Sequence, residues 1–168
     1  MGLSKGTKEL LKCVIICWVG VMLGNLITTF IIFRAEVSGV SMQPTYTDGE
    51  KLWASRNFKV ERGDVVVVKE EHEDAWGTIS YSYLIKRVIG MPGEKIEISG
   101  TQIFVNDSEL TGIFPSIPAE PAGVGFDYVI LGDDEYYVLG DNRGNSRDSR
   151  YFGAVKRDCL VGRVFDQR

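Results

Sequence analysis

In this chain of 168 residues, Lys86 is the residue whose sequence neighbours most directly suggest a catalytic role. The segment around it alternates as a β-strand does, and alternate side chains of a strand share a face. Lys86 should therefore share its face with Leu84 and Val88, while Arg87 points to the opposite face. Burial between apolar neighbours lowers the pKa of a lysine, and a neutral lysine can act as a general base. The alternative is an edge strand whose lysine reaches out to water, and the spacing alone favours that alternative.

Two further segments carry polar residues that could act together with a general base. Ser41 lies in the stretch 38–45, which also holds glycine and proline, and a serine in such a stretch is more often a turn residue than a nucleophile. The stretch 140–153 is dense in hydrogen-bonding and oppositely charged groups. It predicts either a loop held rigid by its own polar network or a solvated surface loop. Neither segment decides the function by itself.

Cysteine and metal chemistry are disfavoured. The three cysteines, Cys13, Cys17 and Cys159, do not form a disulfide framework. A catalytic Cys159 would need a histidine as base, and the one histidine, His72, lies in an acidic segment. That segment, 70–74, lacks two histidines at ligand spacing, so it is better interpreted as a solvated turn than as a metal site. We expect no metal and no cofactor.

The charge distribution argues against nucleic-acid binding. Residues 1–34 carry four basic residues against Glu9 alone, although the whole chain has a net charge of −4. The rest of the chain therefore holds 15 basic and 22 acidic residues, a balance of −7. Phosphate backbones require basic patches, and a net acidic body does not supply them.

The run Cys13–Phe33 is 21 residues long and contains no charge, which predicts a transmembrane helix because roughly 20 residues cross a bilayer. A removable signal peptide has a shorter apolar core of roughly 7–15 residues and a small-x-small cleavage site. The residues after Phe33 offer no such site, so we expect a retained anchor over residues 13–33. Three lysines precede it, which predicts that residues 1–12 are cytoplasmic and that residues 34–168 lie outside, although Arg34 opposes this orientation.

The body after the anchor shows the periodicity and turn residues of β-strands, and we expect it to be all-β, with no helix beyond the anchor. Charged or proline- and glycine-rich loops are expected at 70–77 and 111–125, and irregular polar structure at 140–150. The expected strands are Val37–Val40, Glu50–Ala54, Val65–Val68, Thr78–Ile89, Lys95–Ile98, Gln102–Val105, Glu135–Leu139 and Val161–Phe165.

Taken in order, the three polar segments resemble the conserved boxes of the bacterial type I signal peptidases (leader peptidases). The matching stretches are 41–45, 86–93 and 140–150, and 62–66 looks like a fourth box between the first two. The resemblance covers essentially the whole chain, including the anchor, and its four ordered boxes between residues 41 and 150 outweigh the alternatives above. The length is similar to that of the compact Gram-positive form, which lacks the large second domain of some relatives. The resemblance implies a catalytic β-domain of antiparallel sheets, partly barrel-like, with a small inserted β/loop region near 95–137.

The resemblance also implies a role for individual residues. Ser41 would attack the scissile carbonyl, and Lys86 would take its proton and later deliver one to the departing amine. Ser146 would hydrogen-bond and orient the Lys86 amine. Two ion pairs are expected to stiffen the site: Asp148 with Arg150, and Asp141 with Arg87.

The oxyanion hole is only partly assigned by the resemblance. The backbone N–H of Ser41 is one expected donor. Some family members place a serine two positions before the nucleophile as the second donor, and here that position is Gly39. A backbone group, or Ser38 after a shift of the loop, would have to take its place.

The family's substrates are signal peptides with small residues at the first and third positions before the cut. Such a peptide would add as a strand beside Thr78–Lys86, with Met42 and Ile85 as candidates for lining its pockets. Trp53 and Trp76 would either touch lipid or belong to the core.

The sequence therefore predicts a plasma-membrane serine endopeptidase that removes signal peptides at the extracellular face, near the protein export machinery. An alternative is a specialised enzyme for pilins or other surface proteins, which no residue separates from the general one. A catalytically dead assembly factor should lack the nucleophile or the base, whereas this chain has both Ser41 and Lys86. A membrane-anchored β-domain that only binds partners does not account for four ordered boxes.

Overall fold

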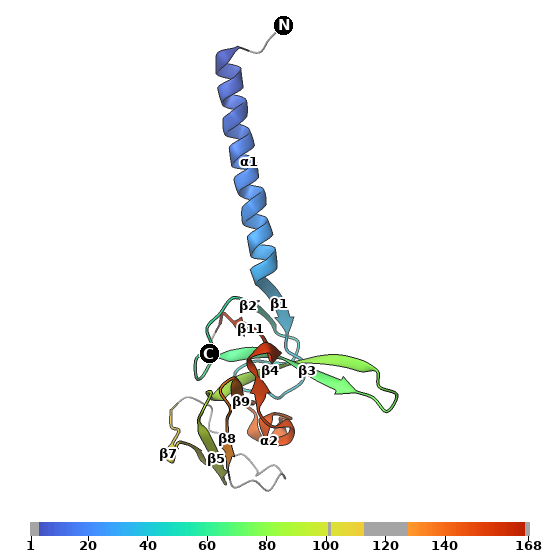
Figure 1. Cartoon of the computed structure of the whole chain (residues 1–168), viewed down its shortest axis with the longest axis vertical. Helices are drawn as coiled ribbons and strands as arrows, with labels where there is room; N and C mark the ends of the chain where they lie inside the picture. The colour runs from blue at the N-terminus through green and yellow to red at the C-terminus, as the bar shows by residue number, and fades with distance from the viewer. Residues whose placement is uncertain (1–3, 101, 113–127, 167–168) are drawn as a thin grey trace.

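A computed structural model of the chain describes residues 4–100, 102–112 and 128–166. One long helix, α1 (Lys5–Ile31), projects from a β-domain (Figure 1). It is the one helix in the described ranges that is long and apolar enough to cross a bilayer, over the segment Lys5–Leu26. The helix ends two residues before the expected end of the anchor, because Ile32 and Phe33 already belong to the first strand.

The main sheet has seven strands in the order β1-β2-β11-β3-β4-β9-β10, and every pair is antiparallel. This confirms the predicted all-β body of antiparallel sheets behind an N-terminal apolar helix. The described strands leave β1 and β10 as two edges, so the sheet is open and not a closed barrel. Its strands are β1 (Ile32–Glu36), β2 (Lys51–Ser55), β3 (Val65–Glu73), β4 (Ile79–Gly90), β9 (Glu135–Leu139), β10 (Val155–Lys156) and β11 (Leu160–Val164).

A second sheet is inserted between β4 and β9, within the region expected near 95–137. Its four strands follow the order β7-β6-β5-β8. Much of the predicted loop 111–125 lies outside the described residues. Strands β7, β8 and β10 are two residues long each, too short for a periodic sequence signal. The strands of this second sheet are β5 (Lys95–Ser99), β6 (Gln102–Val105), β7 (Ser108–Glu109) and β8 (Val129–Ile130).

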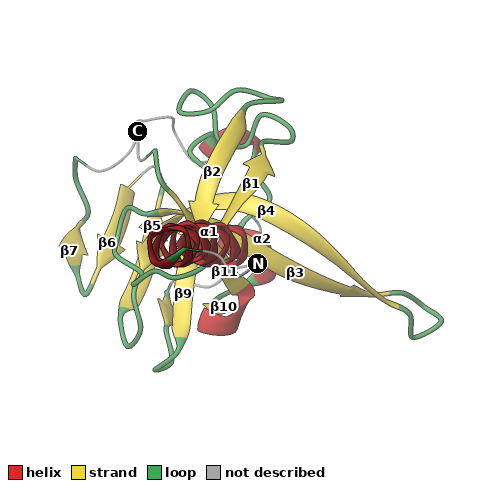
Figure 2. Cartoon of the chain, turned by 90° about the horizontal axis from the view of Figure 1, so that it is seen from above, coloured by secondary structure: helices red, strands yellow, loops and turns green. Residues whose placement is uncertain are grey.

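Two sequence-based predictions of local structure are wrong in detail. The strand expected at Val37–Val40 is absent: β1 starts five residues earlier, and the chain then turns at Gly39, whose φ of +83° suits glycine. The first half of the loop expected at 70–77 is strand, because β3 continues to Glu73 in register with β4 (Figure 2). Cross-strand contacts, including Lys69 Nζ 3.6 Å from the centre of the Tyr81 ring, stabilise this charged segment as strand.

Short helices interrupt the β-domain, where no helix was expected. The α-helix α2 (Ser149–Phe152) is a single turn, and Asp148 caps it by accepting a hydrogen bond from the backbone N–H of Arg150. The β-domain also contains two 3-10 turns, η1 (Arg143–Asn145) and η2 (Arg157–Cys159). One-turn helices have no sequence periodicity, so only the capping residue signals them.

The buried side chains form three clusters that fix the strands around the site. The first joins β1, β2, β11 and one face of β3 and β4 to the loop after β1, and it contains Met42, Tyr46 and Ile85. The second lies on the other face of β3 and β4, and Val66 and Val88 belong to it. The third joins the main sheet to the inserted one. The first two clusters cover the opposite faces of β4, and this leaves both Lys86 and Arg87 buried.

Candidate active site

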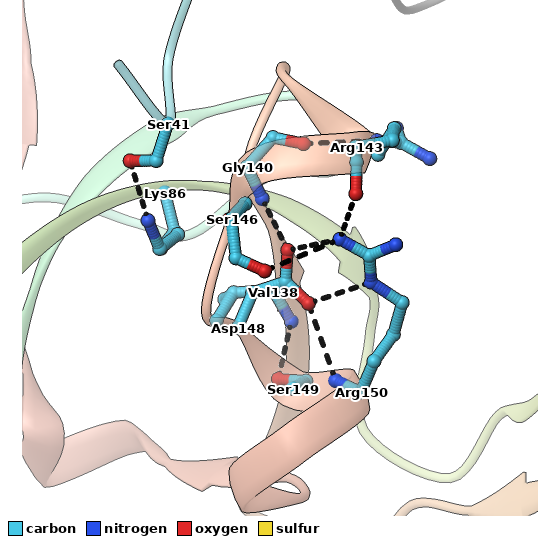
Figure 3. Close-up of polar contacts among 9 residues, drawn as sticks. All are labelled: Ser41, Lys86, Val138, Gly140, Arg143, Ser146, Asp148, Ser149 and Arg150. Atoms are coloured by element: carbon cyan, nitrogen blue, oxygen red, sulfur yellow. Dashed lines mark hydrogen bonds and ion pairs between the residues drawn. The ribbon is translucent and has the colours of Figure 1, made fainter. Parts of the chain in front are cut away.

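Lys86 and Ser41 are in direct contact. Lys86 Nζ lies 2.8 Å from Ser41 Oγ (Figure 3). The lysine lies on the face of β4 that carries Leu84 and Val88, opposite Val66 of β3. It is only 2% exposed, so the alternative of a lysine that reaches out to water is wrong.

The environment of Lys86 shifts its protonation equilibrium toward the neutral amine. Burial is the main effect and lowers the pKa of the amine to about 8, whereas the carboxylates of Asp148 and Asp141 act in the opposite direction. An ordinary lysine is almost fully charged at neutral pH. A pKa of about 8 gives the amine an appreciable neutral fraction there, which is a requirement for a general base.

Ser41 is held in place by its neighbours on both sides. Met42 and Tyr46 are fully buried in the first core cluster, and the backbone N–H of Tyr46 bonds to the Met42 carbonyl. From the facing loop, the backbone N–H of Asn142 donates to the Ser41 carbonyl at 3.0 Å, and Asn142 Nδ2 donates to the Val40 carbonyl at 3.1 Å. Asn142 is thus a site residue that the sequence analysis did not single out, although it lies in the third box.

Ser146 does not make the hydrogen bond to Lys86 that the resemblance implies. Its Oγ is buried, and it has no hydrogen-bond partner among the described residues. A side chain on Gly140 would collide with the Ser146 side chain and would lie 2.6 Å from the Ser41 carbonyl oxygen. The backbone at Gly140, directly after β9, thus approaches both serines where only glycine fits. The orienting function of Ser146 stays a prediction.

Asp148 and Arg150 form the expected ion pair, fully within the protein. The distances are 2.8 Å from Arg150 Nε to Asp148 Oδ1 and 2.9 Å from Nη2 to Oδ2. Asp148 also accepts the backbone N–H of Gly140, and Arg150 donates to the Arg143 carbonyl. Figure 3 shows this network beside the Ser41–Lys86 pair. The polar loop is therefore rigid through its own hydrogen bonds, and it is not a solvated loop.

Asp141 and Arg87 form the second expected pair. Arg87 Nε and Nη2 contact the two carboxylate oxygens at 2.8 and 2.5 Å, and Nη1 donates to the Gly63 carbonyl. Thr45 Oγ1 donates to the same carboxylate at 2.5 Å. Asp141 thus connects the loop of the nucleophile to the strand of the base, and Thr45 is a further site residue for which spacing gave no role.

The geometry around Ser41 bears on the oxyanion hole. The backbone N–H of Gly39 already donates to Asp48 Oδ1 at 2.7 Å. The backbone N–H of Ser41 makes no hydrogen bond within the described part of the chain and is free to act as a donor. Ser38 is exposed.

The two expected pocket residues are both buried in the first core cluster: Met42 and Ile85. Their contact with substrate stays a prediction. Trp53 and Trp76 are both exposed, Trp76 by 91%, so neither is a core residue.

Strand β4 pairs with β3 from Ile79 to Arg87 but with β9 only from Arg87 onward. In the described structure its edge from Ile79 to Lys86 is therefore without a partner strand.

The acidic segment of β3 forms a small polar network. No group of three or more metal-ligating side chains occurs within residues 4–100, 102–112 and 128–166. His72 Nε2 lies 2.8 Å from Ser82 Oγ and 3.4 Å from Glu70 Oε2. Glu70 in turn pairs with Arg147, next to Ser146. Cys159 packs at the margin of the second core cluster.

The chain belongs to the family described as "Signal peptidase, peptidase S26", whose model matches residues 8–166. It is similar to "Signal peptidase IB" of Staphylococcus aureus, with 31% identity over 94% of this chain and 88% of that protein. It is also similar to "Signal peptidase I P" of Bacillus subtilis subsp. natto, with 31% identity over 86% of this chain and 80% of that one.

Two further matches differ in coverage. The "Probable signal peptidase I-2" of Synechocystis sp. is 36% identical over 86% of this chain, but the match spans just 66% of its own length. Among solved structures, a signal peptidase I from Enterococcus faecalis aligns with a TM-score of 0.43 and 24% identity, over 63% of this chain and 97% of that one.

Proposed function

We propose that this chain is a membrane-bound serine endopeptidase that removes N-terminal signal peptides from exported preproteins. Ser41 is the nucleophile and Lys86 is the general base. The observation that carries the proposal is the 2.8 Å contact between Ser41 Oγ and a lysine amine that is almost completely buried. Membership of the signal peptidase family supplies the substrate class.

The reaction follows from this contact. The neutral Lys86 amine takes the Ser41 proton as Oγ forms a bond to the scissile carbonyl carbon. The resulting ammonium returns the proton to the departing amine as the C–N bond breaks, which leaves an acyl-enzyme. Lys86 then deprotonates a water molecule that attacks the ester, and the proton passes back to Ser41 Oγ. The free N–H of Ser41 stabilises the oxyanion in both steps.

Asp141, Arg87, Asp148 and Arg150 position the two reacting groups. Both ion pairs are buried, so moving one partner away would leave the other as an uncompensated charge in the protein interior, which is energetically costly. Ser146, whose hydroxyl is buried without a partner, is the side chain available to bind the amine when Ser41 Oγ turns toward the substrate.

The free edge of β4 is the proposed substrate site. A peptide in extended conformation can add there by backbone hydrogen bonds between Ile79 and Lys86, which delivers its carbonyl to the end of the edge where Lys86 lies. Met42 and Ile85 are the proposed floor of the side-chain pockets.

Helix α1 is the proposed anchor, with the N-terminus in the cytoplasm and the β-domain on the extracellular face. Ser41 lies in the loop that follows β1, ten residues after α1 ends at Ile31. This keeps the site near the bilayer surface, where a substrate with an apolar segment in the membrane presents its cleavage site. The export machinery is the neighbour that would supply such substrates.

The test is cleavage of a preprotein by the full-length protein in detergent micelles, compared with Ser41→Ala and Lys86→Met. Both variants should fold and leave the substrate uncut, while Lys156→Met, an exposed lysine on β10, should cleave at the wild-type rate. Wild-type turnover by Lys86→Met would overturn the assignment of the base.

A further inference from the structure

We propose that Arg34 and Arg56 each bind the phosphate headgroup of an anionic phospholipid, one on either face of the β1–β2 pair, at the level where α1 meets the β-domain. The proposal rests on the proposed membrane anchoring of α1, but not on the proteolytic activity. Three observations support it: the location of the two guanidinium groups, their contacts with aromatic rings, and their lack of carboxylate partners among the described residues.

The location follows from the helix and the first strand pair. The charge-free helical part Cys13–Ile31 is about 28 Å long at 1.5 Å per residue, close to the hydrocarbon thickness of about 30 Å. Arg34 is the first charged residue after it. The backbone N–H of Arg56 donates to the carbonyl of Ile31 at 2.7 Å, which places Arg56 beside the last residue of the helix. Figure 1 shows β1 and β2 directly at this end of α1.

Both guanidinium groups stack on aromatic rings. Arg34 lies 5.3 Å from the ring centre of Trp53, its partner across the β1–β2 register, and Arg56 lies 4.4 Å from that of Phe33. A stacked guanidinium keeps its N–H edge available for a phosphate, which it binds with two parallel hydrogen bonds. Tryptophan is itself favoured at the headgroup level.

Neither Arg34 nor Arg56 has a carboxylate partner among the residues that the structure describes, and both are exposed. Five other arginines do have such a partner: Arg62, Arg87, Arg147, Arg150 and Arg163. The two unpaired cations thus lie at the one end of the domain that an anchored chain holds against the headgroups.

The two arginines lie on opposite faces of the first strand pair. Adjacent residues of a strand point to opposite faces, so Arg34 with Trp53 lies on one face and Phe33, with Arg56 over its ring, on the other. Lipids on both sides of the anchor can therefore be bound at once. Because the rest of the body is net acidic and is repelled by anionic lipid, this pair supplies the local attraction that sets the distance of Ser41 from the membrane.

The experiment uses the full-length protein in neutral detergent micelles with Trp53 as the only tryptophan, obtained by Trp18→Phe and Trp76→Phe. Micelles are titrated with phosphatidylglycerol, phosphatidylcholine or inorganic phosphate, and Trp53 fluorescence is recorded. We expect a saturable change with phosphatidylglycerol alone. An equal response to phosphatidylcholine, or a response to inorganic phosphate alone, would overturn the proposal.

Matched variants then test the two residues. The pair Arg34→Gln with Arg56→Gln should weaken phosphatidylglycerol binding about thirtyfold, since each basic residue at an anionic surface contributes about fivefold. The control pair Lys59→Gln with Lys156→Gln removes the same charge from exposed lysines outside the β1–β2 pair and should change binding less than twofold. If the glutamine pair unfolds, Arg34→Lys with Arg56→Lys replaces it and should weaken binding severalfold, because lysine lacks the bidentate edge.

The outcome is independent of catalysis. A Ser41→Ala protein should bind phosphatidylglycerol with wild-type affinity, even though it cleaves nothing. Unchanged binding in the arginine variants would therefore overturn the two lipid sites and leave the proposed peptidase standing.

Discussion

Arg147 and Glu70 join the polar loop of the site to the extended hairpin: Arg147 Nη1 lies 2.6 Å from the Glu70 carboxylate. Glu70 shares its face of the β3–β4 hairpin with Lys86, because residues paired across the strands point to the same side. Its carboxylate is mostly buried, whereas Arg147 is largely exposed. The pair thus connects the residue after Ser146 to the strand that neighbours the base.

Glu70→Gln should shift the acid limb of the pH–rate profile to lower pH. The Glu70 charge raises the pKa of the Lys86 amine, so its removal lets the amine become neutral at a lower pH. The measurement is kcat/KM against pH with a preprotein substrate. Glu71→Gln, a neighbour on the opposite face of the hairpin, should leave the profile in place.

Lys86→Met should abolish cleavage and yet stabilise the fold at neutral pH. The folded-state pKa of Lys86, about 8, lies below its ordinary value of 10.5, so the unfolded chain binds more protons between these two values. The buried amine therefore destabilises the wild type by an amount that is full below pH 8 and disappears as the pH rises through 10.5. We expect a gain on the order of 1–3 kcal/mol at pH 7.

Urea unfolding of both proteins at pH 7 and pH 10 checks this expectation. The difference between variant and wild type should shrink at the higher pH. A variant that is less stable than the wild type at pH 7 would show that the contact with Ser41 outweighs the cost of burying the amine.

Asp148→Asn should destabilise the domain by about 3–5 kcal/mol, because it leaves the buried Arg150 guanidinium without its counter-charge. The control is Arg163→Gln, which removes a partly exposed pair with Asp64 at 3.5 Å and should cost less than about 1 kcal/mol. Chemical denaturation of both variants measures the difference. Equal losses would mean that burial of the Asp148–Arg150 pair contributes nothing beyond a surface contact.

The strands and the two reacting residues could be predicted from the sequence for identifiable reasons. Val65–Val68 and Glu135–Leu139 are apolar or β-branched runs between turn residues, and the structure has strands there. The alternation of apolar residues along the strand predicted that Lys86 lies on its apolar face. By itself, however, this spacing favoured an edge strand whose lysine reaches out to solvent. Only the order of the four boxes put Ser41 beside it.

Other features depend on tertiary contacts that no local pattern contains. β3 extends into a run of glutamates because β4 pairs with it. Asn142 and Thr45 acquire their contacts when the loop after β9 meets the loop after β1, about 100 residues apart in the chain. The resemblance implied a hydrogen bond from Ser146 to Lys86, but in the structure Lys86 Nζ contacts Ser41 and the Ser146 hydroxyl is left without a partner.

Gly140→Ala should reduce kcat at least tenfold, because its Cβ would collide with the Ser146 side chain and lie 2.6 Å from the Ser41 carbonyl oxygen. Relief of the collision moves the nucleophile relative to Lys86, and a displacement of about 1 Å at reacting groups can cost about a hundredfold in rate. Gly144→Ala, in the same loop, has nothing within 4 Å of its Cβ and should keep the wild-type kcat. Steady-state cleavage of a preprotein, with thermal unfolding to confirm that both variants are folded, makes the comparison. Wild-type kcat in a folded Gly140→Ala protein would mean that the close backbone approach at Gly140 does not set the position of Ser41.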